Sequence, residues 1–331
     1  MNKTPAISVI VPCYNASETI TRCLQSLCQQ TYRNLQIIVV DDCSADRSRA
    51  VVQQFAEQDD RITLLANSTN LGVADTKNIG LQNATGAFVG FLDSDDWLAP
   101  DFLENLLTQA LELDVDFVRC DHTRVTGTVE TVSKAPQGAR NIRLNPRDSV
   151  GPARRKTMID YPYAGAGLIR KRLLDSQGIL FQEGLRSAED RLFFLRLFCE
   201  AESYCVSSEA GYFYRKDIES SLTTNGNESQ LDVFKALHAM SDYVSERKES
   251  TEIREKVLEM SLALTTFHYS SRKRLQETVR KKLFTEIVKF LRASDPALLA
   301  TVTGRWSLKK KLRLKTLSLH ATIRDRLAPK P

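Results

Sequence analysis

The sequence predicts an α/β fold with a mostly parallel, Rossmann-like central sheet, followed by a helical appendage. Short apolar runs rich in β-branched residues alternate with helical segments through the first part of the chain, as in βαβ units. These runs are continuously apolar, which is typical of strands buried on both faces of a sheet. From about residue 227 the apolar residues repeat at helical spacing instead.

The elements of the first half follow in order. Strands are expected at 7–12, 35–40, 61–65 and 87–92, with helices at 18–30, 46–58 and around Lys77. Pro12 stops the first strand, and Ser17 is expected to cap the first helix. A helix at 101–113 and a strand at 116–124 follow. The polar segment 126–156 is expected to form a hairpin and a mobile, lid-like loop.

Composition indicates an ordinary globular chain. Its 331 residues leave room for two core-forming units, and 42% hydrophobic and 26% charged residues are usual proportions. The seven cysteines are scattered without paired C-x-x-C spacing, which favours reduced thiols over a disulfide frame or a zinc site. No early run has the apolar length of a signal peptide, and no stretch reaches that of a membrane span. We therefore expect a cytoplasmic protein, peripheral on the inner face of the membrane if its basic end binds lipid.

Polar clusters follow three of the expected strands. Pro12-Cys13-Tyr14, Asp41-Asp42 and Asp93-Ser94-Asp95 each stand at a strand's carboxyl end, where open parallel sheets bind their ligands. In an extended chain Asp93 and Asp95 share one face, and two carboxylates repel unless a cation lies between them. A small set of oxygen ligands suits Mg²⁺ or Mn²⁺ completed by water and phosphate. The alternative is a solvated acidic turn that caps the helix near Asp101.

Four segments in this order resemble the family 2 glycosyltransferases, which have the GT-A fold. They read VIVPCYN, IVVDDCSADRS, NLGVADTKNIGL and FLDSDDWL, and the resemblance covers about residues 7–214. It implies transfer of a sugar from a nucleotide-sugar, foremost a UDP-sugar, usually with inversion at the anomeric carbon. The implied acceptor is a hydroxyl of a cell-envelope glycan, an exopolysaccharide or a lipid-linked saccharide.

The resemblance also implies roles for residues on the nucleotide side. Tyr14 would pack on the base and Asp42 would accept a hydrogen bond from a base N–H, with Pro12 and Asn15 in the same nucleotide-sugar loop. The alternative for Tyr14 is an aromatic residue at the edge of the core.

On the phosphate side, Asp95 would ligate the divalent ion, and Asp93, with Ser94 beside it, would lie near the ribose or the metal. Lys77 would lie near the phosphates, or else be an ordinary exposed lysine. His122 is a possible third metal ligand, although a lone histidine at a strand end is more often structural.

A base for the acceptor hydroxyl is expected far along the chain. The Glu189-Asp190 pair precedes an aromatic-rich apolar run, which resembles the catalytic-base motif of the family. Asp190 is the expected base and Glu189 an accessory, with Ser187 capping the helix. The displacement would be direct, without a sugar-enzyme intermediate. The alternative is that these carboxylates only stabilise a helix's first turn.

The chain divides into a GT-A domain at 1–226 and a basic helical region at 227–331. The first would contain a nucleotide-sugar half, about 1–97, and an acceptor half, about 98–226. In the second, Trp306 with Leu308, Leu312, Leu319 and Ile323 predicts a helix that could lie on an anionic membrane. A solvated tail or a partner-docking helix is the alternative, and no nucleic-acid-binding motif accompanies the charge.

Two other functions share parts of this pattern. A sugar-phosphate nucleotidyltransferase usually needs a glycine-rich loop after the first strand, where this chain has Pro12-Cys13-Tyr14-Asn15. A non-catalytic nucleotide-sugar binder or scaffold would not depend on Asp95.

Overall fold

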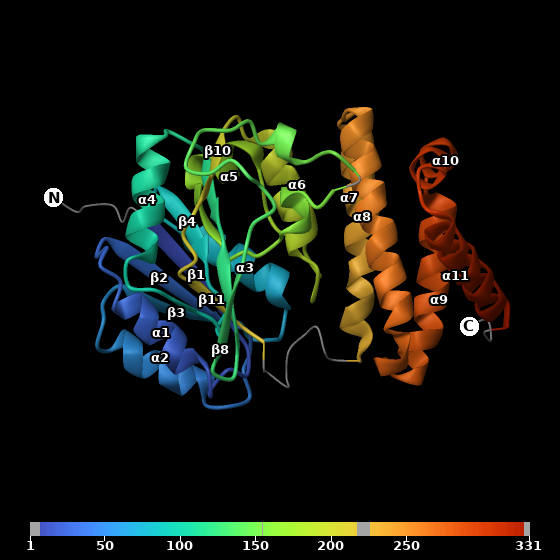
Figure 1. Cartoon of the computed structure of the whole chain (residues 1–331). Coiled ribbons are helices and arrows are strands. Elements are labelled where there is room, and N and C mark those ends of the chain that lie inside the picture. The colour runs from blue at the N-terminus through green and yellow to red at the C-terminus, as the bar shows by residue number, and fades with distance from the viewer. Residues whose placement is uncertain (1–6, 154, 217–225, 328–331) are drawn as a thin grey trace.

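The computed structural model describes residues 7–153, 155–216 and 226–327 (Figure 1). Residues 1–6, which the sequence leads into the first strand, lie outside the described part. The strands are β1 Ile7–Cys13, β2 Leu35–Asp41, β3 Ile62–Ala66, β4 Phe88–Phe91, β5 Trp97–Leu98, β6 Phe117–Cys120, β7 His122–Thr126, β8 Val129–Ser133, β9 Gly167–Arg170, β10 Tyr204–Ser207 and β11 Tyr212–Arg215. The α-helices are α1 Ile20–Cys28, α2 Ser48–Ala56, α3 Val73–Asn83, α4 Phe102–Glu112, α5 Lys171–Gln177, α6 Asp190–Glu200, α7 Asp232–Glu246, α8 Thr251–Ser270, α9 Glu277–Ala293, α10 Pro296–Gly304 and α11 Leu308–Leu327.

The central sheet has the expected parallel core. Within the described residues it is seven-stranded, in the order β10-β6-β9-β4-β1-β2-β3, and only β9 runs antiparallel to its neighbours. Its strands β1 and β4 are buried along their whole length, as their continuous apolar runs predict. A smaller sheet, β5-β11-β7-β8, lies beside it. The alternating strands and helices therefore fold as the sequence predicts.

The prediction of one strand at 116–124 is wrong in one respect. This segment forms two strands, and they belong to different sheets. β6 belongs to the central sheet and β7 to the smaller one. Asp121 stands between them, and its carboxylate accepts hydrogen bonds from the Ala135 amide and the Arg140 guanidinium, both at 2.8 Å. These bonds fix the point at which the chain leaves the central sheet.

The segment after the β7–β8 hairpin is not the free loop that its composition suggests. Leu144 pairs with Tyr204 of β10 through backbone hydrogen bonds of 2.8 and 3.0 Å, and the Asn141 amide donates to the Val206 carbonyl. Arg147 further along binds the carboxylate of Glu249, at the α7–α8 connection. The loop is thereby tied to the sheet edge and to the helical region.

Both predicted serine caps are also wrong. The first helix begins at Ile20, and the amide of Ser17 donates to Asp46 instead, at 3.0 Å. The Ser187 hydroxyl donates to the carbonyl of Ser229, at 2.6 Å. Ser17 is thus tied through its backbone amide, and Ser187 through its hydroxyl, to segments distant in sequence.

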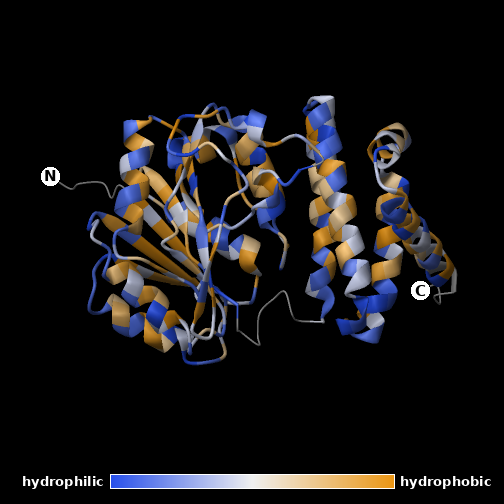
Figure 2. Ribbon diagram, viewed as in Figure 1, coloured by the Kyte–Doolittle hydropathy of each residue, from blue (hydrophilic) through white to orange (hydrophobic). Residues whose placement is uncertain are grey.

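The helices after residue 226 pack side by side, with α10 and α11 farthest from the sheet (Figure 1). Apolar residues of α7 and α8, including Met240 and Val257, belong to the core that contains the sheet. Other residues of the same two helices join α9, α10 and α11 in a second core. Figure 2 shows hydrophobic residues on the facing sides of these helices. None of the described helices is long and apolar enough to cross a membrane.

A substitution of Gly167, at the start of β9, tests the packing of the central sheet. A Cβ at this position would lie 2.2 Å from the carbonyl oxygen of Val118 on the paired strand β6. We expect Gly167→Ala to lower the free energy of unfolding by about 2–3 kcal/mol or more, because the backbone must shift. Gly138→Ala, with no atom within 4 Å of the new Cβ, is the control and should change it by less than about 0.5 kcal/mol. Equal urea midpoints for the two variants would contradict this packing.

Candidate active site

The ends of β1, β2 and β4 lie at one edge of the sheet. Cys13 pairs with Asp41 at the last register position of β1 and β2. The Leu92 amide, just beyond β4, donates to the Ile10 carbonyl of β1 at 3.0 Å. The polar residues that follow these strands therefore emerge side by side, as expected for a parallel sheet.

The loop after β1 presents an aromatic side chain to solvent. Tyr14 is 52% exposed, so it is not an aromatic residue at the edge of the core. Its neighbour Asn15 accepts a hydrogen bond from the Ala45 backbone N–H through its side-chain Oδ1, and donates its own backbone N–H to the Ser44 hydroxyl, both at 2.9 Å. Pro12 is buried within β1. This loop is thus fixed to the loop after β2, while the tyrosine ring remains free to stack.

Asp42 is buried, and its carboxylate is hydrogen-bonded to backbone amides of the protein. Its carboxylate accepts hydrogen bonds from the amides of Leu71 and Gly72 at 2.8 and 2.9 Å, and from the side chain of Asn67 at 2.8 Å. Gly72 has a φ of 99°, which favours glycine. These bonds set the entry to α3. A contact between Asp42 and a nucleotide base stays a prediction.

Lys77, on α3, is not the ordinary exposed lysine. Its side chain is 3% exposed, and its Nζ lies 2.8 Å from Glu189 Oε1 and 3.6 Å from Asp93 Oδ1. Burial alone would lower the pKa of Lys77, but the charges of Asp93 and Glu189 outweigh it and raise that pKa above its ordinary value. One buried ammonium therefore joins the end of β4 to the start of α6.

Asp190, the first residue of α6, stands beside this ion pair. Burial raises the pKa of Asp190 to about 7, and the charge of Glu189 acts in the same direction, while Arg191 and Lys77 oppose it. The side chain is still 24% exposed, so its carboxylate can be reached from solvent. This carboxylate can take up a proton near neutral pH.

Asp93 and Asp95 lie in a turn rather than in an extended segment. The Asp96 amide donates to the Asp93 carbonyl at 3.0 Å, which closes the chain on itself, so the extended-chain argument does not apply. Burial and the neighbouring charge of Asp93 nevertheless raise the pKa of Asp95 to about 6. Ser94 is half-buried between them. Two neighbouring carboxylates whose negative charges repel each other suit a hard divalent cation.

Asp93 and Asp95 are the candidate metal ligands among the described residues. No three His, Cys, Asp or Glu side chains of the described residues are placed to hold a metal together. His122 is fully buried among tyrosines and bonds to the hydroxyl of Tyr161, and burial lowers its pKa to about 4. It is a structural histidine. Two protein carboxylates fit an ion whose other ligands are phosphate oxygens and water.

The sequence predicts no role for three polar residues near the site, although Asp41 belongs to the Asp41-Asp42 cluster at a strand end. Asp96 is buried and accepts hydrogen bonds from the Tyr212 hydroxyl and the Arg215 amide at 2.5 and 2.9 Å, which holds β11 against the acidic turn. Arg119 is fully buried and donates to the carbonyls of Tyr161 and Tyr163. Asp41 Oδ1 is buried without a hydrogen-bond partner among the described residues. The acidic pairs at 95–96 and 41–42 mark Asp96 and Asp41 in the sequence, but their hydrogen-bond partners lie in distant segments and Arg119 carries no signal of its own.

Comparison with known proteins defines the class first. The structure resembles that of Staphylococcus aureus TarS 1–349 in complex with UDP-GlcNAc, with a TM-score of 0.75 and 23% identity, over 96% of this chain and 88% of that one. The mannosyltransferase PcManGT from Pyrobaculum calidifontis, in complex with GDP-Man and Mn²⁺, gives a TM-score of 0.53 and 15% identity over 98% and 88%. The fold is thus GT-A-like, with the helices α7–α11 attached.

Sequence then gives the family. The pattern of "Glycosyl transferase family 2" matches residues 8–176, and the chain belongs to this family. "Uncharacterized glycosyltransferase EpsJ" of Bacillus subtilis is 31% identical over 65% of this chain and 62% of its own length. The poly(ribitol-phosphate) beta-N-acetylglucosaminyltransferase TarS of S. aureus is 27% identical over 71% of this chain and 39% of its own. The match therefore spans less than two thirds of either relative's length.

The buried ion pair gives a stability test. We expect Lys77→Met to lower the free energy of unfolding by roughly 3–5 kcal/mol at pH 8, because it leaves the buried Glu189 carboxylate without its cation. The deficit should be smaller at pH 5. Asp190 already has a raised pKa in the folded state, and loss of Lys77 raises it further. In the variant, the folded protein therefore favours the protonated form of Asp190 more than the unfolded chain does. The variant loses stability as the pH rises from the pKa of Asp190 in the unfolded chain through its pKa in the folded protein.

Urea unfolding at the two pH values measures this effect. Lys282→Met is the matched control, because Lys282 pairs with Glu228 on the surface, where both side chains are more than half exposed. Such a pair contributes about 0–1 kcal/mol. A Lys77→Met deficit below about 1 kcal/mol, or one that does not grow with pH, would show that the buried pair does not stabilise this site.

Proposed function

We propose that this protein is an inverting, metal-dependent glycosyltransferase that moves a sugar from a nucleotide-sugar to an acceptor hydroxyl. The observation that carries the proposal is the Lys77 ion cluster. It joins the acidic turn at Asp93–Asp95 to the Glu189–Asp190 pair, although these segments are far apart in sequence. These contacts support a proposed phosphate-side site and a proposed base for the acceptor that lie close together, beyond the strand ends.

A UDP-sugar is the proposed donor, with UDP-N-acetylglucosamine as the first candidate. Its support is the TarS relative, whose structure contains UDP-GlcNAc. In this chain the exposed ring of Tyr14 offers a surface for base stacking. The proposed acceptor is a hydroxyl of a cell-envelope glycan, an exopolysaccharide or a lipid-linked saccharide. TarS is named for a poly(ribitol-phosphate) acceptor.

Mg²⁺ or Mn²⁺ would be held by Asp95, with Asp93 beside it. The raised pKa of Asp95 and the closeness of Asp93 support a site that gains from a cation. The PcManGT structure, which shares the fold, contains Mn²⁺. When bound, such an ion would neutralise charge that develops on the diphosphate leaving group.

Asp190 is the proposed general base. Its carboxylate would take the proton of the acceptor hydroxyl as the hydroxyl oxygen forms its bond to the anomeric carbon. The bond from that carbon to the diphosphate oxygen breaks in the same displacement, and the bonding electrons leave with the diphosphate. A carboxylate with a pKa near 7 is well matched to this task at neutral pH. Glu189 would act through Lys77 by holding the ammonium in place.

Binding of UDP and Mn²⁺ tests the donor side. At a UDP concentration one hundred times its Kd with 1:1 binding, we expect a stabilisation of about 2.7 kcal/mol, seen as a rise in Tm. Asp95→Asn should remove the part of this rise that depends on Mn²⁺, whereas Tyr14→Ala should weaken UDP binding with or without metal. Asp101→Asn, an exposed carboxylate after the same turn, is the control. No Tm rise with UDP, GDP or dTDP, with or without Mn²⁺, would refute the donor assignment.

The same protein samples separate an enzyme from a scaffold. A glycosyltransferase should release UDP from UDP-GlcNAc in the presence of Mn²⁺, and Asp190→Asn should slow that release with acceptor by about 10²–10⁴-fold. A non-catalytic binder would show the rise in Tm without release of UDP. A sugar-phosphate nucleotidyltransferase would release pyrophosphate from a nucleoside triphosphate instead.

The pH dependence of kcat/KM tests the base. Asp190 accepts a proton only when ionised, so activity should rise with pH and level off above about pH 7. Arg191→Gln should move this rise to higher pH, because Arg191 lowers the pKa of Asp190. Arg196→Gln is the control on the same helix, since Arg196 bonds to the carbonyls of Gln177 and Gly178. An identical pH profile for wild type and Arg191→Gln would count against Asp190.

A further inference from the structure

The last helix, α11, carries apolar residues on two opposite faces. Leu317 and Ala321 are buried in the second core, against α9 and α8. Leu308, Leu312, Leu319 and Ile323 are 73%, 54%, 64% and 47% exposed. Their spacing of four, eleven and fifteen residues from Leu308 places them within roughly 60° of the helix circumference. We call these four residues the outer stripe.

Basic residues border the outer stripe on both sides. Lys309 and Arg313 lie on one side, Lys311 and Lys315 on the other, and all but Lys311 are classed as exposed. None of these four forms an ion pair within 4.0 Å with a described carboxylate. In the sequence from 301 to 331 the one acidic residue is Asp325. The charge around the stripe is therefore positive and uncompensated.

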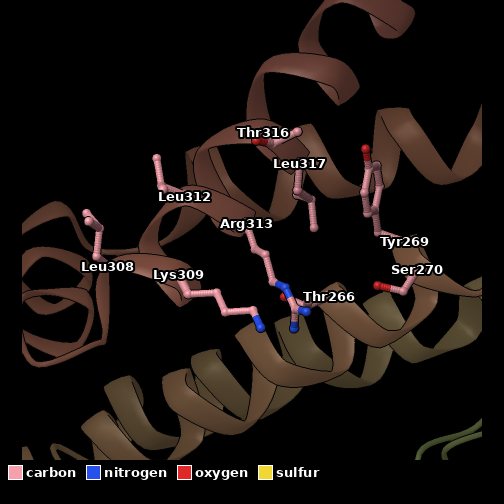
Figure 3. Close-up of a pocket in the computed structure, with 9 residues that line it drawn as sticks. All are labelled: Thr266, Tyr269, Ser270, Leu308, Lys309, Leu312, Arg313, Thr316 and Leu317. Carbon is pink, nitrogen blue, oxygen red and sulfur yellow. The ribbon is translucent and has the colours of Figure 1, made fainter.

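Two grooves flank the stripe. One, between α8 and α11, is lined by Thr266, Tyr269 and Ser270 opposite Leu308, Leu312 and Arg313 (Figure 3). Figure 3 shows Lys309 and Arg313 extending from α11 toward α8. The other groove, between α11 and helices α9 and α10, contains Leu291 and Leu299 opposite Lys315 and Leu319. Each groove thus combines an apolar wall with a cation at its rim.

Trp306 does not belong to the outer stripe, contrary to the sequence prediction. Its indole N–H donates to Glu259 of α8 at 2.7 Å, and the Lys310 ammonium lies 3.8 Å from its ring centre. Lys310 also binds Glu259. These two residues dock the start of α11 onto α8. The outer stripe is therefore held facing away from the bundle.

We propose that the outer stripe and its basic borders bind the surface of an anionic lipid bilayer, with α11 lying in the plane of the interface. Leucine side chains would enter the boundary between headgroups and acyl chains, and the lysine and arginine side chains would meet lipid phosphates. The positive charge on both borders selects this occupant over an uncharged apolar partner. No covalent step is involved, and the proposal does not depend on the catalytic assignment.

Flotation with vesicles tests this binding on the full-length protein without donor or acceptor. We expect binding to vesicles that contain phosphatidylglycerol in phosphatidylcholine, little binding to phosphatidylcholine alone, and weakening with added NaCl. Leu312→Gln with Leu319→Gln should lower the partition coefficient at least about tenfold. Arg313→Gln with Lys315→Gln should lower it about twentyfold on the anionic vesicles.

Leu111→Gln with Ile142→Gln is the matched control, because these side chains are 57% and 50% exposed and lie outside the helical region. The control should bind vesicles like wild type. Circular dichroism and Tm establish that each variant is folded, and UDP release from UDP-GlcNAc should be unchanged in all three. That release assay reports on the proposed function separately, so failure of one proposal does not imply failure of the other.

Three outcomes would overturn the proposal. The first is that the wild-type protein does not bind anionic vesicles at low salt. The second is a folded leucine variant that binds them as well as wild type does. The third is a wild-type dimer in sedimentation equilibrium that the leucine variant converts to monomer, with no vesicle binding, because the stripe would then be covered by a second copy of the chain.

Discussion

The placement of one buried ammonium group determines how the rest of the site is arranged. Lys77 is removed from water almost completely, and a charge in that position is tolerated only with close opposite charges. Those charges come from Asp93, next to a central strand, and from Glu189, which lies 112 residues after Lys77 in the chain. The end of β4, helix α3 and the start of α6 must therefore assemble together. Ion pairing thus couples the fold of the sheet to the geometry of the site.

Negative charge at this edge of the sheet still exceeds positive charge. The carboxylates of Asp93, Asp95, Glu189 and Asp190 lie near the ammonium of Lys77, while the Arg191 guanidinium lies 4.0 Å from Asp190 and the charge of Arg215 acts on Asp95. This excess adds to burial, which is the larger cause, in raising the pKa values of Asp95 and Asp190. Two things can relieve it, a bound cation near Asp95 and a proton on Asp190. A metal-dependent transfer with a carboxylate base uses both, which is why the electrostatics and the proposed chemistry agree.

The sequence was sufficient for the parallel strands β1 to β4, because buried strands leave apolar runs with polar residues at their ends, but it did not predict β9 and β10. It could not predict what those polar residues contact. Asp42 binds the backbone at Leu71 and Gly72, and Ser187 bonds to Ser229, through contacts between segments distant in sequence. The burial of Lys77 could not be predicted from the sequence for the same reason. A lysine on a helix is ordinarily exposed, and only the folded position of Glu189 reverses that.

In the helical region, the spacing of apolar residues likewise predicts the helices but not which of their faces packs inward. In α11 the apolar residues fit two helix faces, and the pattern alone does not tell which face packs inward. The contacts of Trp306 and Lys310 with Glu259 decide it, because they fix the rotation of the helix against α8. Leu317 then packs inward and the outer stripe faces solvent, bordered by cations. A chain selected only for solubility would gain from polar residues there, and the proposed membrane contact gives these exposed leucines a role.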